Sequence, residues 1–326
     1  MVEGKSLGVV IPAYNEERLI AVTLAGIPAF VERIMVVDDC STDGTVSSVR
    51  ACMVNDPRIR LVQHTKNGGV GAAIVTGYQA SLEEDLALIA VMGADNQMDP
   101  AELESLARPV AEGYCDYAKA NRLTTHQAIK NIPKVRFFGN AILSMLTKIA
   151  SGYWHVADSQ AGYTVVSAAA LRRIDLQGLY RRYGFPNDLL IHLNVARCVV
   201  LDVPSRPIYG VGEESGIRLR RVMIGIPILL FRRFWWRMWS RYVVLDFHPL
   251  VFFYAFGSIL LFVGCALGAF VAVRRIEGFE ITAPTIVLVA LMLISGLQLA
   301  MFAMWFDMEA APQAPPRPTN TGDRIR

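Results

Sequence analysis

The chain has 326 residues, of which 53% are hydrophobic and 19% are charged, and its mean hydropathy is +0.35. Soluble proteins average about 25% charged residues, so this composition excludes a disordered chain and argues against a simple soluble globule. The charge is unevenly distributed: residues 220–326 carry 11 arginines, no lysine and 6 acidic residues, whereas residues 1–219 are slightly acidic overall. Arginines interspersed with apolar runs favour contact with a membrane surface over contact with nucleic acid.

The cysteines and the first residues bear on the cellular compartment. Five cysteines are scattered along the chain without a Cys-x-x-Cys spacing. This pattern argues against a disulfide framework or a structural zinc site and favours a reducing compartment. The first apolar run, Leu7–Ile11, is too short for the core of a secretory signal. We therefore expect the N-terminal part of the chain to stay in the cytosol.

The first hundred residues alternate between short apolar runs and helical patterns. Runs rich in β-forming residues are predicted as strands, namely Leu7–Pro12, Ile34–Asp38, Ile59–His64 and Leu86–Met92. The helical patterns between them are Glu16–Ile27, Asp43–Cys52 and Val70–Leu82. Because the predicted strands start every 25–27 residues, the length of one strand–helix unit, the pattern predicts an α/β fold with a doubly wound, mostly parallel sheet. Such sheets bind ligands beyond the carboxyl ends of their strands.

Residues 220–248 combine six arginines with aromatic and aliphatic side chains. This mixture suits the lipid headgroup layer, where rings and arginine stems are buried while the charges remain in water. We expect amphipathic juxtamembrane helices here, with a break at Pro227 because proline disrupts a helix interior. A core helix of the soluble part is the alternative.

Two uncharged apolar stretches follow, Pro249–Val273 and Ile281–Phe306. Either is long enough to cross a hydrocarbon core of about 30 Å. The pair predicts a two-helix transmembrane hairpin over residues 249–306; two buried core helices are the alternative. Arginines before the first stretch outnumber those in the turn, which favours an integral membrane protein with residues 1–219 and a disordered tail, residues 307–326, on the cytoplasmic face.

Polar residues cluster where the predicted strands end. The segments are VVIPAYNEE (Val9–Glu17), VVDDCSTDGT (Val36–Thr45), NGGVGAAIVTGY (Asn67–Tyr78) and VMGADNQMDP (Val91–Pro100). Tyr14 can stack on a base, and Asp38 and Asp39 can accept hydrogen bonds from its N–H groups. The glycines of Gly68–Gly71 permit close backbone approach, and Asp95 can hold a divalent ion against a pyrophosphate. Each feature alone also fits a helix cap or a turn, but together they predict a nucleotide site.

The first two of these segments resemble those of family 2 glycosyltransferases with a GT-A fold. The similarity is specifically to polyprenyl-phosphate glycosyltransferases typified by dolichol-phosphate mannose synthase, over roughly residues 6–220. It implies a cytosolic GT-A catalytic domain at residues 1–219 that transfers a sugar, with inversion, from a UDP- or GDP-linked donor to a membrane dolichyl or undecaprenyl phosphate. It also implies the residues around the donor nucleotide, which are Pro12, Tyr14, Glu16, Val37, Asp39 and Asp95.

The metal motif of the family, Asp-x-Asp-x-Gln, is incomplete in this chain. The corresponding residues read Gly93-Ala94-Asp95-Asn96-Gln97, so the first aspartate is missing. Asp95 and Gln97 retain the other positions, and Mg²⁺ needs only one or two protein carboxylates when phosphates and waters complete its shell. The resemblance therefore implies dependence on Mg²⁺ or Mn²⁺ at a site of reduced charge. A catalytically weak, membrane-anchored nucleotide-sugar-binding protein is the alternative that Gly93 raises.

Arginines are expected beside the two phosphate-bearing substrates. By resemblance, Arg122, Arg136 and Asn140 line the acceptor-phosphate side, and both arginines count among the expected catalytic residues. Guanidinium groups can offset the repulsion between two anionic substrates through bidentate contacts. The family's last segment usually contains Ser-Lys where this chain has Ser-Gly, so Arg206 or Arg218 would supply positive charge to the diphosphate.

An acidic residue is expected near the reacting centre. Asp158–Val166 resembles the family segment beside the donor sugar. Asp188 occupies the segment that carries the acidic residue often assigned as catalytic base, and Asn187 precedes it where related enzymes commonly have Glu. A lipid phosphate is already anionic at pH 7 and needs no base, so Asp188 could instead orient a substrate.

The same sequence is compatible with other acceptors and bears on other partners. A glycolipid or a growing polysaccharide is the alternative acceptor, although the chain lacks the Gln-x-x-Arg-Trp motif of processive members. The five histidines show no metal-ligand spacing and are expected to be structural or on the surface. No nucleic-acid partner is expected, and a homo-oligomer is compatible with the sequence.

Overall fold

The computed structural model describes residues 1–122, 134–205 and 219–312. For residues 134–140 and 219–224 it describes the backbone alone. The described residues fall into two compact units, Met1–Phe234 and Trp235–Ala311.

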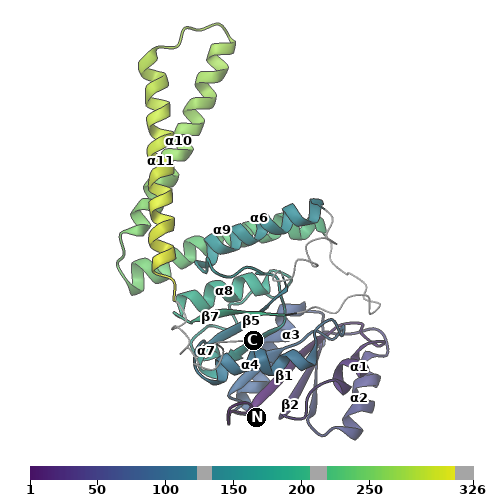
Figure 1. Ribbon diagram of the computed structural model, residues 1–326. Coiled ribbons are helices and arrows are strands. Elements are labelled where there is room, and N and C mark those ends of the chain that lie inside the picture. Colours follow the sequence, from purple (N-terminus) through teal and green to yellow (C-terminus); the bar gives the residue numbers. More distant parts are fainter. Residues whose placement is uncertain (123–133, 206–218, 313–326) are drawn as a thin grey trace, which may run out of the picture. The chain divides into compact units, whose positions relative to one another are not determined.

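A mixed sheet forms the centre of the first unit (Figure 1). Seven strands of the described residues pair in the order β3-β2-β1-β4-β6-β5-β7. Their bounds are β1 Leu7–Ala13, β2 Arg33–Asp38, β3 Ile59–Gln63, β4 Leu88–Val91, β5 Tyr117–Asn121, β6 Thr164–Ser167 and β7 Val200–Pro204. Neighbours are parallel except that β6 runs antiparallel to both β4 and β5. The predicted α/β architecture, with its first four strands, is confirmed.

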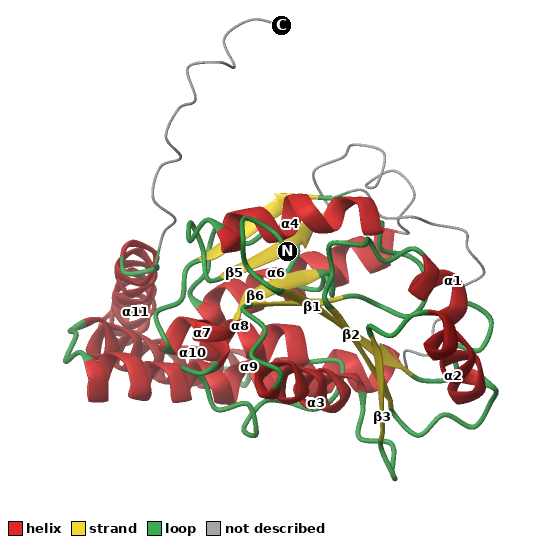
Figure 2. Cartoon of the chain, turned by 90° about the horizontal axis from the view of Figure 1, so that it is seen from below, coloured by secondary structure: helices red, strands yellow, loops and turns green. Residues whose placement is uncertain are grey.

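Helices cover both faces of this sheet (Figure 2). In the first unit they are α1 Ile20–Ala25, α2 Thr45–Asn55, α3 Val70–Glu83, the 3-10 helix η1 Pro100–Glu102, α4 Leu103–Ala111, α6 Lys134–Ser151, α7 Ala168–Leu171 and α8 Phe185–Val195. Because strand side chains alternate between faces, Val9 and Ile11 of β1 pack with α1 and α4, whereas Val10 packs with α3 and α8. The sheet therefore has a hydrophobic core on each side, and its strand ends are left for polar loops.

One helix, α9 (Leu219–Trp239), covers most of the arginine-rich segment. The predicted break at Pro227 is wrong, because α9 continues through that residue. A proline inside a helix costs about 3 kcal/mol. Ile226 and Leu230, on either side of it, are both buried, and their packing offsets that cost. A π-helical segment, η3 Ser240–Leu245, follows directly.

The second unit contains an apolar hairpin of α10 (Leu250–Ile276) and α11 (Ala283–Glu309), as Figure 1 shows. Each helix has 27 residues with a mean hydropathy of 2.4 in its most apolar window, and 11% of that window is buried. Both are long and apolar enough to cross a membrane, so the predicted hairpin is confirmed. The helices meet closely at Gly257, where an added Cβ would lie 3.0 Å from the carbonyl oxygen of Gly296.

A buried ion pair joins the C-terminal end of α9 to that of α11. The Arg237 guanidinium donates to both carboxylate oxygens of Asp307, at 2.7 and 2.8 Å, and both side chains are completely buried. Tyr242 donates a further hydrogen bond of 2.6 Å to Asp307. Asp307 was expected to begin a disordered tail; it is helical instead, because this pair satisfies its charge. From residue 313 onward the expected tail lies outside the described residues.

Candidate functional site

The loops that follow β1 and β2 are bound to each other. The amide of Asn15 donates to Ser41 Oγ at 3.0 Å, and the Asn15 side chain accepts from the amide of Thr42 at 2.9 Å. The amide of Glu16 donates to Thr45 Oγ1 at 2.8 Å. Asn15 has a φ of +56°, in the left-handed region that asparagine tolerates. These contacts fix the first two polar segments beside each other at the carboxyl edge of the sheet.

The residues expected around the nucleoside differ in their exposure to solvent. Pro12 and Val37 are partners across β1 and β2. Val37 is completely buried, whereas Tyr14 is 48% exposed and presents its ring to the surrounding space. Burial and the negative charges of Asp95 and Asp43 raise the pKa of the half-buried Glu16. An aromatic face next to acidic groups at a strand edge suits a base and a divalent cation.

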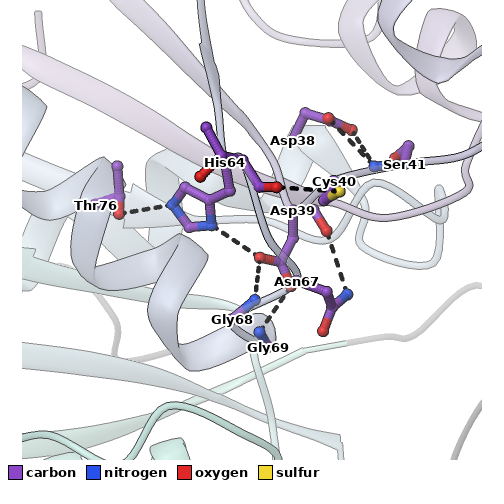
Figure 3. Close-up of polar contacts among 10 residues, drawn as sticks. Asp38, Asp39, Cys40, Ser41, His64, Asn67, Gly68, Gly69 and Thr76 are labelled. Carbon is purple, nitrogen blue, oxygen red and sulfur yellow. Dashed lines mark hydrogen bonds and ion pairs between the residues drawn. The ribbon is translucent and has the colours of Figure 1, made fainter.

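Asp39 is occupied by the loop that precedes α3 (Figure 3). Its two carboxylate oxygens accept hydrogen bonds from the amides of Gly68, at 2.8 Å, and Gly69, at 2.7 Å. Gly69 has a φ of +97°, and an added Cβ would lie 2.6 Å from the carbonyl oxygen of Arg181. The glycine turn was expected to admit backbone close to a ligand; its amides bind Asp39 instead. Contact between Asp39 and a base stays a prediction.

His64 belongs to the same network. Every histidine was expected to be structural or on the surface, and the link from His64 to Asp39 was not predicted. Its Nδ1 lies 2.8 Å from Asp39 Oδ1, and its Nε2 lies 2.9 Å from Thr76 Oγ1 (Figure 3). The available signal was its position directly after a predicted strand and four residues before a glycine pair. The neighbouring Asp38 accepts from the amide of Ser41 at 3.3 Å, which is the local turn role considered for it.

The incomplete metal motif forms the turn after β4. Asp95 is half-buried, and its Oδ1 accepts from the amide of Gln97 at 3.2 Å. An added Cβ on Gly93 would lie 2.9 Å from the same oxygen, so the Asp95 carboxylate lies over the position where the family's first aspartate would begin. Among the described residues no group of three His, Cys, Asp or Glu side chains could hold a metal. Asp95 and Gln97 fit a Mg²⁺ or Mn²⁺ ion that takes its other ligands from a diphosphate and water. Glu16 lies close enough to Asp95 for the charge of Asp95 to raise its pKa.

Arg122 lies at the end of β5 and pairs with Asp158. Its Nε lies 2.8 Å from Asp158 Oδ2, and its side chain is 39% exposed while that of Asp158 is 6% exposed. Arg136 and Asn140 lie on α6, and their side chains are not among those described. Arg206 and Arg218 lie outside the described residues.

Asn187, in the position where related enzymes commonly have Glu, lies in a buried amide cluster. Its side-chain oxygen accepts from Gln160 Nε2 at 2.7 Å and from Thr147 Oγ1 at 3.1 Å. These contacts join α8 to α6 and to the loop before β6. Sequence reasoning singled out neither Gln160 nor Thr147.

Asp188 is completely buried, and its partner is an arginine of α9. Arg233 Nε lies 2.8 Å from Asp188 Oδ1, and the amide of Tyr180 donates to Oδ2 at 2.7 Å. Burial raises the pKa of Asp188, and the charge of Arg233 opposes that shift. A buried carboxylate with these partners has the surroundings of a structural anchor.

Comparisons with known proteins bear on the family and on the fold. Residues 8–175 match the family described as Glycosyl transferase family 2. The chain is 29% identical over 237 residues to UDP-N-acetylglucosamine--dolichyl-phosphate N-acetylglucosaminyltransferase of Methanococcus voltae, an alignment that covers 69% of this chain and 93% of the relative. It is 28% identical to undecaprenyl-phosphate mannosyltransferase of Micrococcus luteus, with 60% and 80% covered. Glucosyl-3-phosphoglycerate synthase from Mycobacterium tuberculosis, solved with Mn²⁺ and UDP, superposes with a TM-score of 0.52 at 16% identity over 71% of this chain and 80% of that structure. This superposition confirms the GT-A fold.

Proposed function

The chain belongs to glycosyl transferase family 2, and we propose that it transfers a sugar from a nucleotide-diphosphate sugar to a membrane polyprenyl phosphate. The observation that carries the proposal is the presence of a GT-A sheet and a two-helix apolar hairpin in one chain. Relatives named for dolichyl-phosphate and undecaprenyl-phosphate acceptors support this acceptor class. A polyprenyl tail remains in the bilayer, so an enzyme that uses it gains from a membrane anchor.

The donor side is assigned to the carboxyl edge of β1, β2 and β4. Tyr14 would stack on the base, and Pro12, Glu16, Val37 and Asp39 would surround the nucleoside. Mg²⁺ or Mn²⁺, bound at Asp95 and Gln97, would stabilise negative charge on the departing diphosphate. The solved GT-A neighbours that bind UDP with either ion support this choice.

The acceptor side is assigned to Arg122, with Arg136, Asn140, Arg206 and Arg218 as further candidates. A phosphate oxygen of the lipid attacks the anomeric carbon while the bond from that carbon to the diphosphate breaks, which inverts the configuration. No proton has to leave the acceptor, because a phosphate monoester is ionised at pH 7. The buried, paired state of Asp188 supports such an acceptor, and the partly exposed guanidinium of Arg122 suits an anion. We place this reaction at the cytoplasmic face, following the arginine bias of residues 220–248.

A donor panel tests the proposal. Membranes with the full chain receive radiolabelled UDP- or GDP-sugars with dolichyl or undecaprenyl phosphate, in Mg²⁺, Mn²⁺ or EDTA. We expect labelled lipid from one donor and none in EDTA. We expect Asp95→Ala to reduce transfer at least about 100-fold, as loss of a group that stabilises transition-state charge does. Asp99→Ala is the matched control, since the Asp99 side chain caps η1 through the amide of Ala101.

The possible outcomes separate the alternatives. Equal transfer by Asp95→Ala and the parent chain contradicts the assignment of Asp95. Transfer only to a glycolipid or polysaccharide identifies the other acceptor class. Donor binding without transfer to any acceptor identifies a nucleotide-sugar-binding protein. The anomeric configuration of the product, measured by NMR, tests inversion, and protease digestion of inside-out vesicles tests the cytoplasmic orientation.

A further inference from the structure

The loop that enters β6 is held by side chains of the neighbouring strands. The amide of Ala157 donates to Asp202 Oδ2 on β7 at 2.7 Å, and Asn121 Nδ2 of β5 donates to the same oxygen at 3.1 Å. Asp158, next in the chain, pairs with Arg122 at the end of β5. The loop therefore rests on polar groups that project from the sheet.

The same strand buries a lysine beneath this loop. Lys119 is completely buried in β5, and its Nζ donates to the carbonyl oxygen of Ala161. Lysines are almost never fully buried without a partner. The charged groups that act on this ammonium are Asp158 in the loop, Asp202 on β7 and Arg122, which directly follows β5. Two carboxylates and one guanidinium thus act on the Lys119 ammonium, which has no role in the reaction proposed above.

The same loop also contacts the candidate site, through Gln160. Gln160 lies between the two residues that are tied to β5, and its Nε2 donates to Asn187 of α8 at 2.7 Å. The amide of Gln160 also donates to Asp158 Oδ1 at 3.2 Å. A displacement of the Ala161 carbonyl would therefore move Asp158 and Gln160 together, and with them the partners Arg122 and Asn187.

We propose that Lys119 is a positioning residue, whose buried ammonium holds residues 157–161 so that Asp158 orients Arg122 and Gln160 orients Asn187 for glycosyl transfer. The inference rests on the proposed function for its catalytic consequence, whereas its effect on the loop is independent of that function. The charge matters as well as the shape, because a neutral side chain of equal length would leave Asp158 and Asp202 without their shared cation.

A pH response follows from the same geometry. Burial lowers the pKa of Lys119 from its ordinary value of 10.5 to about 8, against the opposing effects of Asp158 and Asp202. The ammonium is therefore protonated at pH 7 and loses its proton as the pH rises through 8. We expect the loop to be held less tightly over that interval, because the neutral amine no longer attracts Asp158 and Asp202.

The test compares Lys119→Met and Lys119→Arg with the parent chain, all as full-length protein in detergent micelles. Hydrogen exchange of the peptide covering residues 157–163 reports the loop directly. We expect Lys119→Met to exchange there at least about tenfold faster while peptides of β1 and β2 are unchanged. We expect kcat to fall about 100-fold, as a misplacement of about 1 Å can cause, with the donor KM within threefold. Lys119→Arg, which keeps the charge and a donor, recovers most of the loop protection and of kcat.

Tyr117→Phe is the control, because Tyr117 is buried in the same strand and its hydroxyl hydrogen-bonds to Thr164 of β6, which lies just beyond the measured peptide. It is expected to lower the unfolding temperature without changing exchange of the loop. Should Lys119→Met fail to fold, exchange of the parent chain at pH 7 and pH 9, corrected for intrinsic base catalysis, decides the question. Faster loop exchange at pH 9 supports the proposal, and unchanged exchange overturns it.

Unchanged loop exchange and kcat in a folded Lys119→Met chain also overturn the proposal. So does a loss of kcat that Tyr117→Phe reproduces in proportion to its loss of stability. If the parent chain transfers no sugar to any polyprenyl phosphate, the proposed function fails, and the exchange data still decide whether Lys119 holds the loop.

Discussion

Arg233 of α9 places its guanidinium 2.8 Å from the completely buried carboxylate of Asp188 in the first turn of α8. The same guanidinium donates to the carbonyl oxygen of Gly178 at 2.6 Å. One side chain of the arginine-rich helix therefore binds both α8 and the loop before it. The contact gives Asp188 a role in fixing α8, which also carries Asn187 of the candidate site.

From this pair we predict that substituting either partner lowers the stability of the protein by a similar amount. Removing one member of a buried ion pair leaves an uncompensated charge, so we expect Asp188→Asn and Arg233→Met each to lower the free energy of unfolding by about 3 kcal/mol. The double variant should lose less than the sum of the two. Chemical denaturation gives the stabilities, and transfer assays give kcat. An Asp188→Asn variant that is inactive but stable, beside an active Arg233→Met variant, would show Asp188 to be a catalytic base.

The position of Gly93 predicts that restoring the family motif does not increase activity. An added Cβ lies 2.9 Å from Asp95 Oδ1, the end of a side chain that can rotate. Gly93→Ala should therefore change stability by less than about 1 kcal/mol while it displaces the Asp95 carboxylate and lowers transfer about tenfold. Gly93→Asp carries the same Cβ and should transfer no faster than the parent chain. Initial rates over a Mg²⁺ titration check both variants, and a faster Gly93→Asp chain would contradict the prediction.

The Arg237–Asp307 pair predicts a large effect on the second unit. Both side chains are completely buried, so Arg237→Met should cost about 3–5 kcal/mol by leaving Asp307 unpaired. Arg237→Met/Asp307→Leu should recover most of that loss, because it removes both charges. Arg274→Met serves as the control: its pair with Glu277 is exposed and 3.6 Å long, so at most about 0.5 kcal/mol is expected. Thermal unfolding in micelles measures all three, and equal effects of Arg237→Met and Arg274→Met would refute the assignment.

His192 predicts how stability depends on pH below neutrality. Burial, and then the charge of Arg233, lower its pKa from 6.5 to about 4. Between these values the unfolded chain binds more protons than the folded chain, so the free energy of unfolding falls as the pH falls from 6.5 toward 4. The histidine alone contributes about 3 kcal/mol to that loss. His192→Gln should reduce the fall in the free energy of unfolding between pH 6.5 and 4 by this amount, as measured by chemical denaturation at each pH. An unchanged fall would contradict the prediction.

The local part of the fold was predictable from sequence. β1 to β4 are found where the apolar runs and their regular spacing indicated them, because each strand–helix unit is encoded by adjacent residues. The reversal of β6 was not predictable, since Thr164–Ser167 has the same β-forming composition whichever way it runs. Its direction depends on pairing with β4 and β5, strands that are far away in the sequence.

For the candidate site, the sequence indicated which residues gather at the strand ends but few of their contacts. Polar residues after strands pointed to the carboxyl edge of the sheet, and the resemblance supplied most of the individual roles that are proposed. The partners of Asp39 lie 25 to 30 residues away, and Arg233 lies 45 residues from Asp188. No periodicity links such residues. A single sequence therefore does not distinguish a carboxylate that is free to bind a ligand from one that is already bound by its own chain.

The close approach of α10 and α11 at Gly257 and Gly296 limits how the hairpin can move. An added Cβ at Gly257 would lie 3.0 Å from the carbonyl oxygen of Gly296, and one at Gly296 would lie 2.9 Å from the amide nitrogen of Leu261. With backbone against backbone, neither helix can rotate about its own axis without a steric clash. The hairpin therefore keeps one fixed outline, and the exposed rings of Phe252, Phe256 and Phe262 hold constant positions on it.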